Sequence, residues 1–302
     1  MGLQEDERRG LDTFVSAEEF ARSVLKLRGE RSVKAAYHIS EAEVIISSLE
    51  PNPTSDSEDY REANYRPSDR RKWLRNKILD ELYYMERLDN DDEIRLGHGG
   101  SKPEEVSHNS EAYIVIGPPA SGKSGIAIKL ADKYGAYMLD SDYAKRKFPE
   151  FHGYIGGASL VHKEADDLVF EPENSLAEYC LYNKVNVVVP LVGRTIDSVE
   201  DFCNMLKMYG YKINIVAVSL NSFTCVLRAY KRFLETKRYV PLSYVFDQVG
   251  NKPDKVYDEL KNRYASDSSF KSFTRVSTDV KRGQLPTVLD SSDNSPEIFN
   301  RQ

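Results

Sequence analysis

Short apolar runs alternate with amphipathic stretches over the last two thirds of the chain. Four of these runs are bounded by polar residues and rich in Val, Ile, Leu or Tyr, which is typical of buried strands. They cover residues 112–116, 137–139, 186–189 and 213–220. Because helical patterns lie between them, the sequence predicts an α/β fold with a central, mostly parallel sheet flanked by helices.

The helical patterns of this region share apolar residues at spacings of three to four. They cover residues 126–134, 161–170, 175–182, 198–209 and 255–264. A basic helix is also predicted after Leu220, and two short strands are predicted within residues 271–290.

The first hundred residues carry helical signals and no strand run. Ser16 to Glu19 resembles a capping box, and a second helix is predicted over residues 40–49. The polar, proline-bearing segment 51–59 predicts an exposed linker or loop. Pro67 then opens a stronger helix whose apolar positions include Trp73.

The chain therefore divides into a helical extension with flexible segments, residues 1–105, and a sheet domain, residues 106–302. Two interpretations of the extension remain open. It is either a scaffold that packs on the sheet domain or a docking surface for an inhibitor or chaperone.

The segment after the first strand fits the phosphate-loop pattern of Gly, four residues, Gly, Lys and Ser. In this pattern backbone N–H groups curl around phosphate oxygens, the lysine reaches the β- and γ-phosphates, and the serine hydroxyl ligates Mg²⁺. The strand before it and the helix after it are the context that the motif requires. We therefore predict binding of ATP and Mg²⁺, with Ser124 as a metal ligand, through Gly117, Ala120, Ser121, Gly122, Lys123 and Ser124.

Two carboxylates, Asp140 and Asp142, follow the second strand. Ligands of open parallel sheets bind beyond the carboxyl ends of the strands. A kinase needs a carboxylate to accept the proton of the attacking hydroxyl, and oxygen ligands for Mg²⁺. We predict that Asp142 is the base and a metal ligand and that Asp140 binds on the substrate side or the metal side. The alternative is that this segment caps the next helix.

The third strand ends in Pro190-Leu191-Val192, without the acid that many phosphate-loop enzymes carry there. Gly193-Arg194-Thr195 follows at its carboxyl end. Arg194 suits an anionic substrate group, with Thr195 beside it, because a guanidinium matches phosphate geometry. A surface salt bridge is the alternative for Arg194.

The basic helix after the fourth strand is dense in positive charge for an acidic protein. Arginines stabilise the charge of a transferring phosphoryl group, often from a mobile lid. We predict that Arg228 and Arg238 do so, with Arg232 near the nucleotide as a substitute for either. An exposed basic helix without a target is the alternative.

Composition argues against nucleic acid and membrane as partners of this protein. The net charge is −6 and the pI about 5.6, so a whole-chain electrostatic footprint for nucleic acid is absent. The sequence contains no run of eighteen apolar residues, so we expect no membrane span. The N-terminus has no apolar signal-peptide core. Cys180, Cys203 and Cys225 have no metal-ligand spacing and lie in apolar stretches, which predicts buried free thiols and a reducing cytosol.

Four stretches together resemble the zeta-toxin family of phosphate-loop kinases, over roughly residues 110–290. They are residues 117–124, Asp140-Ser141-Asp142 with Pro149-Glu150-Phe151, Gly193-Arg194-Thr195, and the basic helix running into Lys237-Arg238-Tyr239-Val240-Pro241. The resemblance implies that Asp142 is the catalytic base and that Lys123 and Ser124 serve phosphate and Mg²⁺. It also implies that Arg238 is the second lid arginine, and Arg228 or Arg232 the first.

The family phosphorylates a hydroxyl on a nucleotide-linked substrate, most familiarly UDP-N-acetylglucosamine. Some plant-pathogen effectors of similar sequence phosphorylate NAD on a ribose hydroxyl. Zeta toxins usually carry Glu-Gly-Thr where this chain has Pro190-Leu191-Val192, and that Glu helps to hold the amino sugar. This departure favours NAD, because a site built to hydrogen-bond one substrate rejects analogues. By analogy, the protein is a bacterial toxin or effector, cytosolic or secreted into a host cell, with a small antitoxin or chaperone as partner.

Two other classes of function compete with the kinase. A nucleotide-binding regulatory module without transfer activity would explain the missing acid after the third strand. A nucleic-acid end kinase would use the basic helix, but the negative net charge argues against it.

Overall fold

The computed structural model describes residues 9–49, 51–281 and 283–299, and its centre is a six-stranded sheet. The strands are β1 (Glu111–Ile116), β2 (Tyr137–Met138), β3 (Val187–Leu191), β4 (Lys212–Ser219), β5 (Phe270–Ser277) and β6 (Thr287–Ser291). Their order is β2-β3-β1-β4-β5-β6, and only β6 runs antiparallel to its neighbour. The predicted α/β fold with a mostly parallel sheet is confirmed.

The helices occupy most of the remaining described chain. The α-helices are α1 (Phe14–Ser23), α2 (Glu30–Ser47), α3 (Pro53–Asp56), α4 (Ser68–Tyr84), α5 (Lys123–Tyr134), α6 (Ser141–Lys145), α7 (Gly157–Leu160), α8 (His162–Phe170), α9 (Leu176–Tyr182), α10 (Ile196–Met208), α11 (Ser222–Thr236) and α12 (Lys252–Tyr264). Shorter turns are η1 (Glu58–Tyr60), η2 (Ala63–Tyr65), η3 (Asp91–Glu93), η4 (Pro149–Phe151), the π-helix η5 (Tyr244–Val249) and η6 (Glu297–Phe299).

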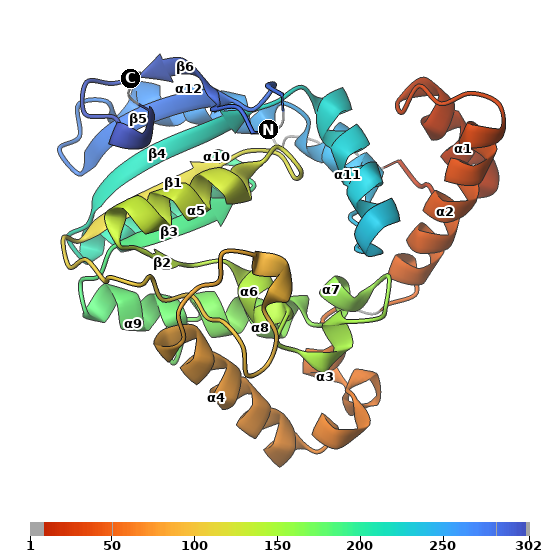
Figure 1. Cartoon of the computed structure of the whole chain (residues 1–302), viewed down its shortest axis with the longest axis horizontal. Coiled ribbons are helices and arrows are strands. Elements are labelled where there is room, and N and C mark those ends of the chain that lie inside the picture. Colours follow the sequence, from red (N-terminus) through yellow and green to blue (C-terminus); the bar gives the residue numbers. More distant parts are fainter. Residues whose placement is uncertain (1–8, 50, 282, 300–302) are drawn as a thin grey trace, which may run out of the picture.

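The sheet and its helices form the main hydrophobic core. Helix α5 packs on β1, β2 and β3, and it crosses the sheet in the foreground of Figure 1. Helices α10 and α12 pack on β4. Val and Ile side chains of the central strands are fully buried, as expected for parallel strands covered on both faces.

The N-terminal helices pack in two different places (Figure 1). Helices α1 and α2 share a second hydrophobic cluster with α11 and the chain that follows it, including Phe20, Ile39, Val226 and Phe233. Helix α4 instead contacts α6, α8 and α9, and its Ile78 and Leu82 join the main core. The extension therefore supports both the basic helix and the segment that carries Asp140 and Asp142.

Several N-terminal elements differ from the sequence predictions. The second helix begins at Glu30 rather than at residue 40, because Ala35, Ala36 and Ile39 bury the same face as Ala42. The first helix is capped by Thr13, whose hydroxyl accepts a hydrogen bond from the Ser16 amide, and not by a capping box at Ser16.

The segment 51–59 is not an exposed linker. Pro53 and Thr54 are buried within α3, and the Thr54 hydroxyl donates to the Leu160 carbonyl at 2.8 Å. A buried side-chain hydrogen bond of this kind anchors the polar segment to the domain, which composition alone does not reveal.

The buried face of α4 also differs from the prediction. Trp73 is 55% exposed and stacks on Tyr65, while Arg71 and Glu81 are buried. Arg71 donates to Glu164 and to Glu150, each pair at 2.7 Å, and all three side chains are nearly inaccessible. A pattern of apolar residues misses such a face because charged residues with buried partners take apolar positions.

All three cysteines are buried and none forms a disulfide. Burial raises the pKa of each thiol, to about 12 for Cys203 and about 11 for Cys225. Among the helices of the described ranges, none is long and apolar enough to cross a membrane.

Candidate active site

The sheet brings three separate sequence motifs to one edge. β1 lies beside β3, with Ile116 opposite Leu191, and β2 lies on the other side of β3. Because the three strands are parallel, their carboxyl ends meet. The phosphate loop, the acidic segment 140–142 and the segment 192–195 therefore come together, as expected for a ligand site of an open α/β sheet.

The backbone of the phosphate loop requires small residues. A Cβ on Gly117 would lie 2.6 Å from the Val218 carbonyl oxygen, and Gly122 has a φ of 91°. Ala120 also adopts a left-handed φ of 61°. The residue after β5 holds the loop in place, because the Thr278 hydroxyl donates to the Ser121 carbonyl at 2.5 Å. Its amide groups thus curl at the N-terminus of α5, where a phosphate is favoured.

Lys123 folds back over this loop. Its Nζ donates to the carbonyls of Gly117 at 2.6 Å and Pro118 at 2.8 Å. Burial lowers the pKa of Lys123 to about 8, although the charges of Asp140 and Asp142 oppose the shift. The two carboxylates therefore lie close enough to Lys123 to act on its charge. Ser124, the next residue, is exposed at the start of the helix.

Asp140 and Asp142 take different parts in the turn after β2. Asp140 is the N-cap of α6 and accepts a hydrogen bond from the Asp142 amide at 2.9 Å, so the capping alternative holds for Asp140. Burial and the neighbouring charge of Asp142 raise the pKa of Asp140 to about 6.

Asp142 accepts a hydrogen bond from Lys145 Nζ at 2.9 Å, and its side chain is 55% accessible to solvent. Burial opposes its ionisation, but the charges of Lys145, Arg146 and Arg232 hold the pKa of Asp142 below its usual range. Asp142 is therefore an ionised acceptor at neutral pH.

The arginines of the basic helix separate into two groups. Burial lowers the pKa of half-buried Arg232, and this pKa also responds to nearby charges. Those charges belong to Arg238, Asp142 and Arg146. Arg238 forms an ion pair with Asp92 of η3 at 2.6 Å. Arg228 instead lies beside the phosphate loop, where it donates to the Thr278 carbonyl at 3.0 Å. The structure thus brings Arg232 and Arg238 to the surroundings of Asp142, and Arg228 to the loop after β5.

A cavity of about 440 Å³ adjoins the phosphate loop on the side of Arg228. Its lining includes Gly122, Ile126, Arg228, Thr278, Gln284 and Pro286. An apolar side chain, a guanidinium and a proline around a cavity of this size suit a flat base beside the phosphates.

Arg194 and Thr195 lie at the carboxyl edge of β3 and are exposed. Burial raises the pKa of Tyr244 in η5, and the positive charge of Arg194 opposes this shift. Thr195 is the N-cap residue of α10, and its hydroxyl donates to Ser198 Oγ at 3.0 Å. Across residues 9–49, 51–281 and 283–299, Arg194 makes no ion pair, so the surface salt bridge considered for it does not form there.

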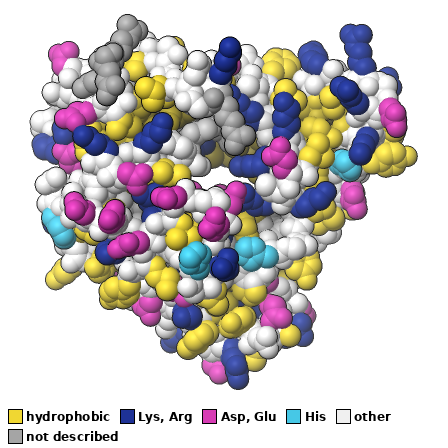
Figure 2. Space-filling model, viewed as in Figure 1, with side chains coloured by type: hydrophobic (Ala, Val, Ile, Leu, Met, Phe, Trp, Pro, Cys, Tyr) yellow, Lys and Arg dark blue, Asp and Glu magenta, His cyan; other side chains and the backbone are white. Residues whose placement is uncertain are grey.

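Polar atoms around the site lack protein partners. Three buried atoms there have no hydrogen-bond partner among the described residues, namely Ser121 Oγ, Arg146 Nε and Arg232 Nε. Figure 2 shows a hollow near the centre of this face, with Lys and Arg side chains on the side of α11 and Asp and Glu side chains on the side of α6. Buried donors without partners are costly, so this hollow is suited to an anionic ligand.

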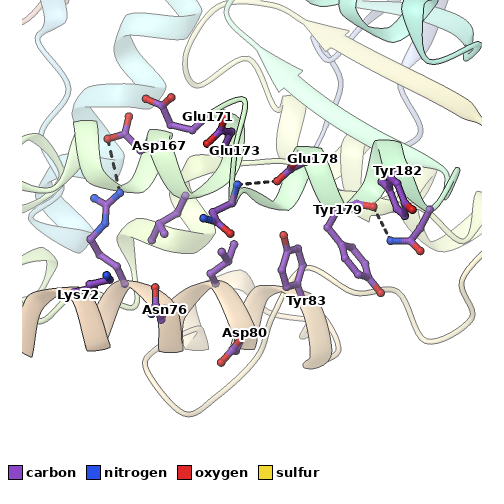
Figure 3. Close-up of a pocket in the computed structure, with 15 residues that line it drawn as sticks. Lys72, Asn76, Asp80, Tyr83, Asp167, Glu171, Glu173, Glu178, Tyr179 and Tyr182 are labelled. Atoms are coloured by element: carbon purple, nitrogen blue, oxygen red, sulfur yellow. Dashed lines mark hydrogen bonds and ion pairs between the residues drawn. The ribbon is translucent and has the colours of Figure 1, made fainter.

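A larger groove of about 870 Å³ lies elsewhere, between α4 and the helices α8 and α9 (Figure 3). Asp80, Asp167, Glu171, Glu173 and Glu178 line it, together with Tyr83, Tyr179 and Tyr182. None of the predicted site residues lines this groove. Because its acidic side chains outnumber the basic Lys72 and Arg75, the groove does not suit a triphosphate, and the hollow at the strand ends remains the candidate active site.

The donor set at the phosphate loop fits Mg²⁺. Mg²⁺ is usually held by one or two carboxylates and substrate phosphates, with water completing its shell. Ser124 offers an exposed hydroxyl, and Asp140 and Asp142 offer carboxylates whose charges reach the adjacent Lys123. No group of three or more His, Cys, Asp or Glu side chains forms a metal cage within the described part of the chain. A protein-only cage is not needed for this ion.

Four residues of the site were missed by sequence reasoning. They are Asp92, Lys145, Arg146 and Thr278. Lys145 and Arg146 stand in a basic triplet with Lys147, but nothing in the triplet distinguishes the two residues that face the site. Asp92 and Thr278 lie far from the motifs along the chain, and only folding brings them there.

The sheet order, the phosphate loop and the basic side chains beside an ionised carboxylate define a nucleotide-binding protein of the phosphate-loop class. Comparison with known proteins then narrows this class. Residues 100–280 match the family model described as Zeta toxin, and the chain belongs to this family. Family membership confirms the resemblance drawn from the motifs and supports kinase activity of the zeta type. No protein of curated function matches the sequence.

Solved structures are similar to this chain at low sequence identity. One comes from the PezAT chromosomal toxin–antitoxin system of Streptococcus pneumoniae, with a TM-score of 0.51 and 14% identity over 74% of this chain and 82% of that chain. The AvrRxo1-ORF1:AvrRxo1-ORF2 complex with sulphate ions gives a TM-score of 0.40 and 12% identity over 82% of this chain and 73% of that chain. The native form of that complex gives 0.38 and 12% identity over 97% and 81% of the two chains.

Proposed function

We propose that this protein is an ATP- and Mg²⁺-dependent kinase that phosphorylates a hydroxyl group of a nucleotide substrate. The observation that carries the proposal is the position of ionised Asp142, near enough for its charge to act on both Lys123 and Arg232. A base near both the phosphate loop and a lid arginine is the arrangement that phosphoryl transfer requires.

Each step has a residue to serve it. The phosphate-loop amides and Lys123 hold the β- and γ-phosphates, and Mg²⁺ on Ser124 and Asp142 would neutralise their charge. Asp142 takes the proton of the acceptor hydroxyl as the new O–P bond forms and the bond to the β-phosphate oxygen breaks, so that ADP leaves. Arg232 and Arg238 stabilise the transferring phosphoryl group.

This proposal exchanges the roles first expected of Arg228 and Arg232. Arg228 binds the nucleotide, because it contacts Thr278 and lines the cavity beside the phosphate loop. Arg232 is the first lid arginine, because it shares the electrostatic surroundings of Asp142.

We favour NAD as the acceptor, phosphorylated on a ribose hydroxyl, over UDP-N-acetylglucosamine. Pro190 and Leu191 end β3 with half-buried apolar side chains and offer no carboxylate to an amino sugar. Asp140, Arg194 and Thr195 lie at the same edge and are the candidates to contact the acceptor.

A protein partner is consistent with the proposed kinase function. In a toxin of this family, we expect a small antitoxin or chaperone to restrain the enzyme, in a bacterial cytosol or during delivery into a host cell. Under this proposal residues 106–302 are the kinase domain and residues 1–105 the extension. Neither a nucleic-acid nor a membrane partner is part of it.

An acceptor screen tests the proposal. Purified protein with ATP and Mg²⁺ receives NAD or UDP-N-acetylglucosamine in separate reactions, and mass spectrometry detects a gain of one phosphate, about 80 Da. Asp142→Asn is the control, which should abolish the product while ATP binding persists. We expect a phosphorylated product from NAD alone. A product from UDP-N-acetylglucosamine alone would refute the proposal that NAD is the acceptor.

The apolar end of β3 favours one second candidate, a nucleotide-binding module without transfer activity. It would bind ATP with the same affinity in wild type and Asp142→Asn and give no product with either acceptor. Such a result would replace the kinase proposal.

A further inference from the structure

A second cavity, of about 380 Å³, lies between the end of α11 and the chain around η4. Its lining includes Asp92, Arg146, Phe151, Tyr154, Lys237 and Arg238. None of the residues that line the cavity at the phosphate loop lines this one. It is therefore a separate compartment, next to the lid arginine Arg238.

Arg146 is the buried charge of this cavity. The residue is 9% exposed, and its Nε has no hydrogen-bond partner among the residues that the structure describes. The next residue, Lys147, is fully buried and paired with Glu81 at 2.8 Å, so the backbone that presents Arg146 is firmly held. A buried guanidinium with an unused donor is costly unless an anion completes its coordination.

Asp92 is the anion that now stands at this position. Its Oδ1 lies 2.6 Å from Arg238 Nη2 and 3.5 Å from Arg146 Nη2, so one carboxylate bridges the two guanidinium groups. The contact to Arg146 is long for a charge-assisted hydrogen bond. Asp92 is also 59% exposed, so a stronger anion can displace it without unfolding its surroundings. The preceding Asp91 is held separately by the Tyr143 hydroxyl at 2.7 Å.

The charges and aromatic side chains of the cavity indicate which kind of anion could replace Asp92. Once Asp92 has moved away, Arg146, Lys237 and Arg238 supply three positive charges. A diphosphate diester carries two negative charges, and arginine pairs bind phosphate oxygens in parallel. Phe151 and Tyr154 line the cavity as well and supply aromatic surface against which a base or sugar attached to the diphosphate can pack.

We propose that this cavity binds the diphosphate of the acceptor substrate and that Asp92 is a built-in competitor, which occupies the site until the acceptor arrives. The inference rests on the proposed function, because it assigns part of the acceptor to the lid side of Asp142. It applies to a dinucleotide and to a sugar nucleotide alike, since both are diesters of a diphosphate.

Calorimetry on the whole protein tests the inference by direct binding. The phosphate loop is first saturated with a non-hydrolysable ATP analogue, and inorganic pyrophosphate is then titrated as the probe. Arg146→Met should weaken pyrophosphate binding about 10- to 100-fold, the range of a hydrogen bond to a charged group. Asp92→Asn should tighten it about tenfold, because the competing carboxylate is gone. Lys231→Met removes an exposed charge from α11 and should change binding less than twofold.

Asp92→Asn decides the test even if Arg146→Met fails to fold, because Asp92 is an exposed residue. Unchanged or weaker pyrophosphate binding by Asp92→Asn would overturn the inference. The diphosphate site and the kinase activity can fail separately. If Asp92→Asn tightens and Arg146→Met weakens pyrophosphate binding, but the protein phosphorylates neither acceptor, the diphosphate site is supported and the kinase proposal is refuted. If the protein phosphorylates an acceptor, but Asp92→Asn changes neither the KM for that acceptor nor pyrophosphate binding, the diphosphate site is refuted and the kinase proposal stands.

Discussion

The two arginines at positions 228 and 232 stand one helical turn apart, yet the structure predicts that their replacement affects different kinetic constants. Arg228 contacts Thr278 beside the nucleotide cavity, whereas Arg232 lies among the charges around Asp142. We therefore expect Arg228→Ala to raise the KM for ATP and Arg232→Ala to lower kcat.

The magnitudes follow from the contacts. Arg228 makes one charge-assisted hydrogen bond to the Thr278 carbonyl, at 3.0 Å, and Thr278 in turn holds the Ser121 carbonyl. These contacts hold the Arg228 guanidinium at the cavity beside the phosphate loop. Loss of one charge-assisted hydrogen bond from that guanidinium to the bound nucleotide would cost about 1.5–3 kcal/mol, which corresponds to a KM for ATP about 10- to 100-fold higher. An arginine that stabilises the transferring phosphoryl group contributes about 10³–10⁵ in kcat, so Arg232→Ala should lose about 4–7 kcal/mol of transition-state stabilisation.

Steady-state kinetics with the acceptor found in the screen separates the two effects. Rates are measured over a range of ATP concentrations at saturating acceptor and Mg²⁺. Lys231→Ala is the matched control, because Lys231 is an exposed cation between the two arginines on the same helix. Its KM and kcat should stay within about twofold of wild type.

One result would refute this reasoning. If Arg228→Ala lowered kcat by a thousandfold with an unchanged KM, while Arg232→Ala mainly raised the KM, the assignment of the first lid arginine to position 232 would be wrong. Equal loss of kcat in both variants would show that the two side chains act on the same charge.

Three further outcomes are expected. The kcat/KM for ATP should rise with pH through about 6, as Asp140 ionises, and fall above about 8, as Lys123 loses its proton; Asp140→Asn should remove the acidic limb. Arg71→Met should lower the free energy of unfolding in urea by about 3–5 kcal/mol, because two buried carboxylates lose their partner. Burial opposes ionisation of Glu164 but Arg71 holds its pKa low, so this stabilisation is present above pH 4.5, is lost as pH falls, and the loss on mutation should shrink in acid. Ser124→Ala should raise the Mg²⁺ concentration needed for half-maximal rate about tenfold or more, and an unchanged requirement would exclude Ser124 as a ligand.

Local sequence determined the phosphate loop and the strands around it. Residues 117–124 form a contiguous motif whose glycines, lysine and serine act on one ligand, and the apolar run before it can only be buried. The order of strands and helices likewise predicted a mostly parallel sheet, because short apolar runs separated by helices leave few other packings. The position of Asp140 and Asp142 at a strand end followed from the same pattern.

Tertiary structure decided which charged residues face the site. Arg228 and Arg232 are four residues apart and share a helix face, so their sequence positions do not distinguish them. The fold gives them separate neighbours: Arg228 contacts Thr278 in the loop after β5, whereas the charge of Arg232 acts on Asp142 of α6. Arg71 and Glu81 are buried because partners from residues 147–164 neutralise them, a long-range condition that hydrophobic periodicity cannot express. Asp92 joins Arg146 and Arg238 for the same reason: electrostatic pairing depends on distance in space, whereas the sequence records only distance along the chain.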